Sequence, residues 1–286
     1  MDLAAADFEV LRAYVRRVVG IELGDDKQYL VRQRLEPVAQ AFGCSTFSAL
    51  ASMVATFPSL SLRDEVIEAM TTNETSFFRD THPFEAFRSH VLPLLGEVVA
   101  TRRRFPGDRG LARANIMSAG ASTGQEAYSI AMCVDEYCRL GDVSGLRADE
   151  VTILALDVSQ RVLARVTAGE YTALEVARGL TPLQRDRFFQ PKGQNWVVRD
   201  ELRRMVQCRA LNFAEPMPFL GTFDVVFCRN ILIYFDNEMK RSILRRFYEL
   251  LQPGGFLVLG STETLYGLVD CYETLHVGGT ILYRRK

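Results

Sequence analysis

Histidine and paired cysteine are scarce in this chain. The three histidines lie far apart, and no two of the six cysteines have the CxxC spacing that is typical of a structural zinc site. We therefore expect neither a metal centre nor a disulfide framework. Scattered thiols of this kind are typical of proteins in a reducing compartment, so the predicted location is the cytoplasm.

The chain also lacks long apolar runs and a strong net charge. No apolar stretch reaches the roughly eighteen residues of a membrane-spanning helix, so we expect no insertion into a membrane. The start of the chain carries Asp2, Asp7 and Glu9, where a signal peptide would be positively charged. A net charge of −1 gives no long-range attraction to nucleic acid, which is therefore not an expected partner.

The chain has 286 residues, of which 48% are apolar, enough for a sizeable core in one large or two modest domains. Near its start the apolar side chains recur at helical spacing, as at Phe8, Leu11 and Val15. We predict an N-terminal helical domain over residues 1–75, with one helix over 27–40 that Pro37 should kink or end. The residues alone do not exclude a packing module that only supports the main fold.

Strands and helices alternate from Asn115 onwards, which is typical of an α/β protein, and we predict a second domain over residues 76–286. Residues 169–206 break the alternation, and we predict a small β-subdomain inserted there. A helix over 82–100, kinked at Pro93, and a solvated basic loop over 102–113 precede the sheet. A later helix should stop at the Pro-Gly-Gly of 253–255. The strands are expected from Asn115 and over 151–156, 205–211, 223–228, 256–259 and 279–283.

The loop after the first strand is made of small residues. Residues 118–124 are all small, so a ligand or another part of the backbone can approach closely. The next strand ends in Asp157. A small-residue loop after one strand and an acid after the next is the geometry of a nucleoside site, in which the carboxylate takes the ribose hydroxyls. Because the loop lacks the dinucleotide glycine pattern, a tight turn in an ordinary α/β domain is the alternative.

Residues 70–80 form a polar segment that ends in two aromatic residues, an arginine and an aspartate. Without further context, we favour Asn73 or Thr75 as a helix cap and Phe77 and Phe78 as core residues. The other interpretation is a polar lip whose Arg79 could hold a carboxylate.

Polar side chains also follow the later strands, as at Asn212, Arg229 and Asn230. In an open parallel sheet the ligand binds beyond the carboxyl ends of the strands. Together with Asp157 and the small-residue loop, these side chains would form one polar rim. Helix capping alone does not account for so many polar groups on one rim, which favours a ligand site.

Three strings of the sequence, in this order, closely resemble the CheR family of class I S-adenosylmethionine-dependent methyltransferases. They are NETSFFR at 73–79, SAGASTGQE at 118–126 and FDVVFCRNILIYF at 223–235. The resemblance covers nearly the whole chain, including the helical domain and the inserted segment. It implies an α/β fold with a Rossmann-like S-adenosylmethionine methyltransferase sheet, an N-terminal all-helical domain and a small β insertion.

The same resemblance implies a function. Members of this family methylate glutamate side chains of chemotaxis receptors, so the expected activity is that of a protein-glutamate O-methyltransferase. The expected donor is S-adenosyl-L-methionine, with S-adenosyl-L-homocysteine as its product. The expected partner is the cytoplasmic domain of a methyl-accepting chemoreceptor, and we expect the enzyme to act as a monomer.

The resemblance also assigns roles to residues. Arg79 and Tyr234 would face the substrate carboxylate as catalytic residues. Glu126 would contact the methionine part of the cofactor, and Asp157 would bind its ribose. The other cofactor-binding residues would close over the donor, reach its adenine or complete its pocket: Asn73, Thr75, Arg79, Gly120, Asn212, Phe213, Arg229 and Asn230.

Two features depart from the family pattern. In the family, a strongly basic second helix of the N-terminal domain meets the receptor, whereas here the first forty residues carry six basic and seven acidic side chains. We therefore expect a different receptor contact, or one that uses Arg12 and Arg16. The loop at 190–195 is short, which favours a member that does not dock on the C-terminal pentapeptide of a receptor.

Two other functions stay open. One is a non-catalytic protein that binds the cofactor and regulates a chemosensory array, although intact Arg79, Glu126 and Tyr234 speak against it. The other is a methyltransferase for small molecules or nucleic acid. The motif of enzymes that methylate amino groups of nucleic acid, Asp or Asn followed by Pro-Pro and an aromatic residue, is absent where Arg229 and Asn230 stand.

Overall fold

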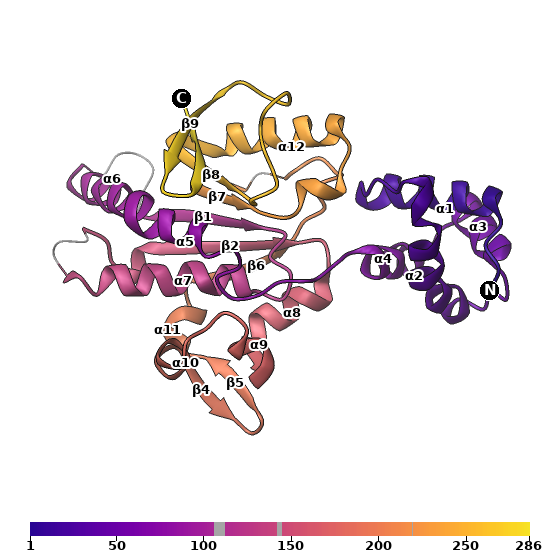
Figure 1. The fold of residues 1–286 in the computed structure, drawn as a ribbon, viewed down its shortest axis with the longest axis horizontal. Coiled ribbons are helices and arrows are strands. Elements are labelled where there is room, and N and C mark those ends of the chain that lie inside the picture. Colours follow the sequence, from indigo (N-terminus) through magenta and orange to yellow (C-terminus); the bar gives the residue numbers. More distant parts are fainter. Residues whose placement is uncertain (106–111, 142–144, 219) are drawn as a thin grey trace.

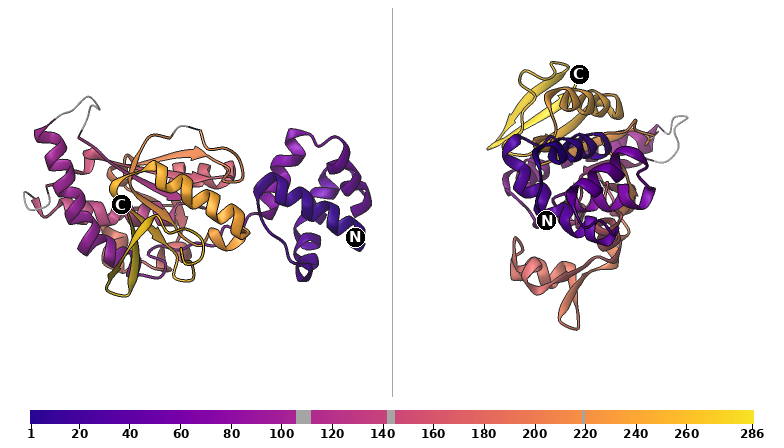
Figure 2. Two further views of the ribbon diagram at one scale, coloured as in Figure 1. Left: turned by 90° about the horizontal axis from the view of Figure 1, so that it is seen from above. Right: turned by 90° about the vertical axis from the view of Figure 1, so that its right-hand side faces the viewer.

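A computed structural model describes residues 1–105, 112–141, 145–218 and 220–286. A helical N-terminal part stands at one end of the molecule, and a three-layered α/β part with a small appended sheet makes up the rest (Figures 1 and 2). An irregular segment, residues 71–81, joins the two. In the described ranges, no helix combines the length and the apolar character needed to cross a membrane.

The N-terminal part contains four α-helices packed around one apolar core. The predicted apolar face of the first helix is confirmed, since Phe8, Leu11 and Val15 are at most 1% exposed. Thr46 and Ser59 cap the third and fourth helices by accepting backbone N–H groups three residues ahead. The helices are α1 (Ala5–Val19), α2 (Gln28–Ala41), α3 (Phe47–Thr56) and α4 (Leu60–Met70), with a 3₁₀ turn η1 (Asp25–Lys27) before α2.

Pro37 was predicted to kink or end its helix, and the second of these outcomes is wrong. α2 continues through Pro37 to Ala41. Leu35, Val38 and Ala39 flank the proline and are buried in the core of the N-terminal part. Their burial holds the last turn of the helix in place, although proline removes one backbone hydrogen bond.

The central sheet has seven strands in the order β6-β2-β1-β7-β8-β10-β9. β6, β2, β1, β7 and β8 run parallel, and β10 runs antiparallel to both of its neighbours. The strand order reverses between β1 and β7, and at such a switch point parallel sheets bind their ligands. The strands are β1 (Ala114–Ala119), β2 (Val151–Asp157), β6 (Val206–Ala210), β7 (Phe223–Cys228), β8 (Leu251–Leu259), β9 (Tyr272–Val277) and β10 (Thr280–Arg285).

Helices cover both faces of the sheet. On one face, α12 packs Ile243, Leu244 and Phe247 against residues of β1, β7 and β8. The other face is covered by α5 and α6 with a π-turn between them, by α7 and by α8. The bounds are α5 (His82–Ala86), η2 (Phe87–Val91), α6 (Leu92–Arg104), α7 (Gln125–Cys138), α8 (Gln160–Ala168) and α12 (Asn237–Leu250), with 3₁₀ turns η4 (Ala148–Glu150) and η5 (Leu232–Tyr234).

Two further expectations need correction. α12 ends at Leu250, and Pro253–Gly255 lie inside β8, so the Pro-Gly-Gly does not stop the helix. Glycine is required at 255 because a Cβ there would lie 2.8 Å from the carbonyl oxygen of Asp224. The predicted basic loop begins too early, because α6 runs on to Arg104, and Arg102 forms an ion pair with Asp224. Of that loop, residues 106–111 lie outside the described residues.

The inserted segment forms a three-stranded sheet in the order β3-β5-β4. A two-residue turn, Gly193 and Gln194, joins β4 to β5, so the loop at 190–195 is as short as expected. This sheet packs against the segment that joins the two large parts, because the ring of Phe77 lies 5.1 Å from that of Tyr171 and 5.5 Å from that of Phe189. Its elements are β3 (Glu170–Thr172), α9 (Ala173–Ala177), α10 (Pro182–Phe188), β4 (Phe189–Lys192), β5 (Asn195–Val198) and α11 (Asp200–Arg203).

Candidate active site

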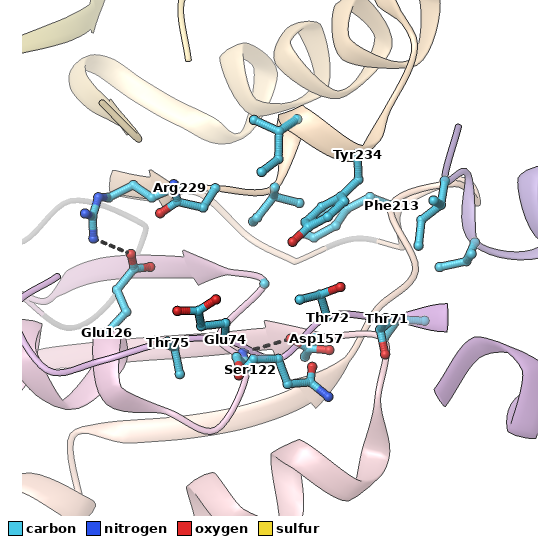
Figure 3. A pocket seen from close by; sticks show the side chains of 18 of the residues that line it. Thr71, Thr72, Glu74, Thr75, Ser122, Glu126, Asp157, Phe213, Arg229 and Tyr234 are labelled. Atoms are coloured by element: carbon cyan, nitrogen blue, oxygen red, sulfur yellow. Dashed lines mark hydrogen bonds and ion pairs between the residues drawn. The ribbon is translucent and has the colours of Figure 1, made fainter. Parts of the chain in front are cut away.

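A cleft lies at the carboxyl ends of the parallel strands, between the sheet and the helical N-terminal part (Figure 3). It contains about 1100 Å³ of empty space, part of it open to solvent. Every residue to which the resemblance assigns a role lines this one cleft: Asn73, Thr75, Arg79, Gly120, Glu126, Asp157, Asn212, Phe213, Arg229, Asn230 and Tyr234. The predicted polar rim therefore exists as one continuous surface.

The small-residue loop between β1 and α7 is held in place by Asp157. One carboxylate oxygen accepts the backbone N–H of Ser122 at 2.8 Å, and the other accepts that of Ser159 at 3.0 Å. Ser122 has a left-handed backbone, with φ of +50°, which this hydrogen bond helps to hold. Burial raises the pKa of Asp157, and the backbone N–H groups oppose that rise. Each oxygen keeps a second lone pair with which it can accept from a hydroxyl group.

Glu126 lies in the first turn of α7 and lines the cleft. It accepts hydrogen bonds from the Ser118 hydroxyl at 2.8 Å and from Arg229 at 3.0 Å. Burial raises the pKa of Glu126, while the positive charge of Arg229 acts in the opposite direction. Figure 3 shows the two side chains meeting across the inner end of the cleft.

Arg229 lines the cleft and also holds neighbouring segments of the chain in place. Besides Glu126, it donates to the carbonyl oxygen of Arg79 at 2.6 Å and to the carboxylate of Asp80 at 3.0 Å. The side chain of Arg229 is only 2% exposed. It thus links the end of β7, the start of α7 and the turn that carries Arg79.

The turn around Arg79 has an unusual backbone. Phe78, Asp80 and Thr81 have φ values of +49°, +66° and +46°, a region that costs free energy for residues other than glycine. The Arg79 guanidinium donates to the carbonyl oxygen of Glu74 at 3.0 Å. Because Arg229 binds the backbone of this turn, the position of Arg79 depends on Arg229.

Of the predictions made for residues 70–80, the two core residues are confirmed and the helix cap is wrong. Phe77 and Phe78 are core residues, at 1% and 8% exposure. Asn73 and Thr75 cap no helix, because residues 71–76 are irregular, and the Asn73 carbonyl oxygen accepts a hydrogen bond from the Ser122 hydroxyl at 2.9 Å. Local sequence could not reveal this contact, since it joins residues 49 positions apart.

Tyr234 reaches into the cleft from the segment between β7 and α12 (Figure 3). Its carbonyl oxygen accepts the backbone N–H of Glu22 at 2.8 Å, so the helical part of the chain holds it in place. Asn212 also joins the two parts, because its side-chain amide donates to the carbonyl oxygen of Val18 at 2.7 Å. The ring of Phe213 is 7% exposed and packs edge-on against Phe247.

Some residues of the cleft were not foreseen from the sequence. Val19 and Ile21 line it from the helical part, which therefore contributes to the site as well as supporting the fold. Their apolar side chains carry no sequence signal that separates a cleft wall from a core. Glu263 was also missed, because it lies in a loop after β8 and its carboxylate binds a segment about thirty residues before it.

The lining suits a cationic nucleoside. Val19, Ile21 and Phe213 offer apolar surface for a base, and Asp157 and Glu126 offer carboxylates for hydroxyl and ammonium groups. Within the described ranges, no three His, Cys, Asp or Glu side chains cluster as metal ligands would. The apolar and carboxylate groups of the lining fit S-adenosyl-L-methionine, an adenine nucleoside with a positively charged sulfur.

Comparison with known proteins agrees with S-adenosyl-L-methionine as the cofactor. Residues 6–71 match the all-alpha domain of CheR methyltransferases, and residues 73–278 match their S-adenosylmethionine-binding domain. Chemotaxis protein methyltransferase 1 of Pseudomonas aeruginosa is 42% identical over 287 residues, which cover 100% of both chains. Chemotaxis protein methyltransferase Cher2 of Pseudomonas putida is 40% identical with the same coverage. The chemotaxis protein methyltransferase of Vibrio parahaemolyticus is 41% identical, and the match covers 93% of this chain and 92% of the relative.

Solved structures show a weaker likeness. The structure of PKMT2 from Rickettsia typhi with AdoHcy has a TM-score of 0.36 and 13% identity, and the match covers 66% of this chain and 26% of that chain. This likeness adds nothing to the assignment, which depends on the full-length sequence matches. The chain belongs to the CheR methyltransferase family.

Proposed function

We propose that this protein transfers the methyl group of S-adenosyl-L-methionine to glutamate side chains on the cytoplasmic domains of chemoreceptors. Family membership over the whole chain supports methyl transfer in chemotaxis. The observation that carries the proposal is the cleft itself, in which Arg79 and Tyr234 share one lining with Glu126 and Asp157. The enzyme would act as a monomer in the cytoplasm.

The cofactor would lie along the carboxyl ends of β1, β2 and β7. Asp157 would accept the ribose hydroxyls, and Phe213 with Val19 would flank the adenine. Glu126 would receive the ammonium group of the methionine part, and Asn73 and Thr75 would close over the donor from the joining segment. Arg229 and the Asn212 amide are engaged by the protein, so both would act mainly by holding their neighbours.

The reaction needs little from the protein besides alignment. The bound donor supplies a methyl group that its positively charged sulfur has already activated. A glutamate carboxylate is ionised at neutral pH, so no general base is required. One carboxylate oxygen forms the new bond to the methyl carbon as the carbon–sulfur bond breaks, and that bond's electron pair stays on sulfur. The products are a methyl ester and S-adenosyl-L-homocysteine, and no proton moves.

Arg79 and Tyr234 would orient the attacking carboxylate. An arginine and a phenol can each donate to the carboxylate oxygen that does not attack, which fixes the line of approach. A strong ion pair would make the nucleophile less reactive, so a modest contact is expected. The hydrogen bond from Arg79 to the Glu74 carbonyl oxygen fits this role, because it shares the guanidinium with the protein.

Two measurements test the proposal together. Calorimetry with S-adenosyl-L-homocysteine measures binding to the cleft, and methyl-labelled donor measures transfer to receptor cytoplasmic fragments. We expect binding, and label that mild base releases from wild-type fragments. Fragments whose methylated glutamates are changed to glutamine should stay unlabelled. Binding without transfer to any receptor fragment would contradict the proposal and favour a non-catalytic regulator.

The short β4–β5 turn supports a further detail of the substrate. With only Gly193 and Gln194 between the two strands, this edge offers little loop surface for a receptor tail. We therefore expect methylation without a C-terminal pentapeptide. Receptor fragments with and without their last five residues should be methylated at equal rates, and a strong loss on truncation would contradict this expectation.

A further inference from the structure

The carboxylate of Glu263 accepts hydrogen bonds from four backbone N–H groups. One oxygen accepts those of Asn230 at 2.8 Å and Gly260 at 2.9 Å, and the other accepts those of Ile231 at 2.9 Å and Leu232 at 2.7 Å. Hydrogen bonds between a carboxylate and backbone N–H groups are stronger than those between neutral groups. A single side chain thus secures three consecutive residues of the segment that leaves β7.

That segment leads to Tyr234, one of the two proposed catalytic residues. The Ile231 carbonyl oxygen accepts the N–H of Tyr234 at 3.1 Å, so Tyr234 lies one turn beyond the groups that Glu263 holds. Asn230 adopts a left-handed backbone with φ of +58°, which costs free energy for asparagine unless its surroundings fix it. The hydrogen bond from the Asn230 N–H to the Glu263 carboxylate holds this backbone conformation.

Gly260 lets the two loops approach closely. A Cβ at this position would lie 2.7 Å from the Glu263 carboxylate and 3.0 Å from the N–H nitrogen of Asn230. The first distance is shorter than Cβ atoms essentially ever show and the second is tighter than most Cβ contacts, so a larger residue would displace the carboxylate. The small size of Gly260 therefore allows the Glu263 carboxylate to reach these backbone N–H groups.

We propose that Glu263 is a positioning residue for methyl transfer, which sets the place of Tyr234 against the attacking carboxylate. The proposal rests on the proposed function, because it concerns the same reaction. Glu263 would act through the backbone of residues 230–232, and the ribose contact of Asp157 would not depend on it. The consequence is a separation of effects, with turnover more sensitive to Glu263 than cofactor affinity.

The test uses the full chain and three variants. Glu263→Gln replaces one accepting oxygen by an amide that repels two of the N–H groups, and Gly260→Ala displaces the carboxylate from the other side. Glu273→Gln is the matched control, because it makes the same chemical change at an exposed position on β9. We expect kcat on receptor fragments to fall about tenfold or more for the first two variants, with the Kd for S-adenosyl-L-homocysteine within about threefold of wild type.

A double-variant cycle separates positioning from general damage. If Glu263 acts through Tyr234, then Glu263→Gln combined with Tyr234→Phe should lose little more turnover than the more severe single variant. Independent, multiplying losses would overturn the proposal, and so would an unchanged kcat in Glu263→Gln. If that variant does not fold, Gly260→Ala decides by the same criteria. A wild-type chain that transfers no label would refute the proposed function as well, whereas an active wild type with unaffected variants refutes this inference alone.

Discussion

Arg229 and Glu126 form an ion pair of 3.0 Å at the inner end of the cleft, with the arginine side chain 2% exposed and the glutamate side chain 12% exposed. The pair joins the end of β7 to the start of α7. Through its second nitrogen, Arg229 also holds the backbone of Arg79 and the carboxylate of Asp80. One buried arginine therefore links the start of α7, where the proposed function places the cofactor, to the turn that carries Arg79.

Arg229→Lys should destabilise the protein strongly. A lysine ends in a single nitrogen and cannot span the acceptors that the two terminal nitrogens of Arg229 reach separately, so at least one of them loses its partner. We expect the free energy of unfolding to fall by about 3 kcal/mol, as when a buried ion pair is broken. Urea unfolding followed by circular dichroism measures it. Arg178→Lys is the control, because its pair with Glu74 is more than 60% exposed on both sides and should change stability by less than about 1 kcal/mol. Equal effects of the two changes would contradict the bracing role.

Tyr234→Phe should reduce turnover with little change in cofactor affinity. The change removes one hydroxyl group that faces the cleft, and the backbone contact with Glu22 remains. We expect kcat to fall about tenfold or more, since the lost contact helps to align the reacting carboxylate. Tyr266→Phe, at a residue that is 93% exposed, should leave kcat unchanged. A weaker Kd for S-adenosyl-L-homocysteine with unchanged kcat would instead place Tyr234 in cofactor binding.

Gly179→Ala should disrupt the contact between the small sheet and the joining segment. Its φ is +107°, and a Cβ would lie 2.0 Å from the carbonyl oxygen of Phe77, two residues before Arg79. We expect a loss of about 3 kcal/mol or more in the free energy of unfolding, because the backbone must shift. Gly193→Ala also has a positive φ, of +61°, but meets nothing within 4 Å and should cost only about 1 kcal/mol. Urea unfolding of both variants compares them, and a larger loss at 193 would contradict the close approach at 179.

Asp236 gives the fold a pH-dependent stabilisation. Its pKa is lowered, first by the hydrogen bond from the backbone N–H of Met239 at the start of α12 and also by Arg16 of α1. A carboxylate with a lowered pKa in the folded state contributes stability above its unfolded pKa of 3.8, and that stability is lost as the pH falls through the folded value. Asp236→Asn should therefore be less stable than wild type above about pH 5, with the difference shrinking towards pH 3. Urea unfolding over this range measures it, and a difference that grows on acidification would contradict the assignment.

The sequence predicted those parts of the site that follow from strand direction. Asp157 ends β2, and Asn212 and Arg229 follow the ends of β6 and β7, and parallel strands place their carboxyl ends on one edge. Ser159 caps α8 by accepting the backbone N–H of Val162, a contact that acts within three residues. Local rules of this kind are enough to place the cleft.

What the sequence could not reveal depends on contacts between distant segments. The roles of Arg229 and Glu263 arise from partners about 150 and 30 residues away, and neither residue lies in a pattern that names those partners. Pro37 was predicted to kink or end its helix, and it does not end it, because the propensity of proline was weighed without the core around it. Val19 and Ile21 look like core residues, and only the placement of the helical part against the sheet makes them walls of the cleft.

The most direct test of the account is a crystal structure with S-adenosyl-L-homocysteine. We predict the nucleoside in the cleft, with its ribose on Asp157, its methionine part at Glu126 and its sulfur turned towards Tyr234 and Arg79. A cleft that stays empty, or a nucleoside bound elsewhere on the protein, would contradict the account.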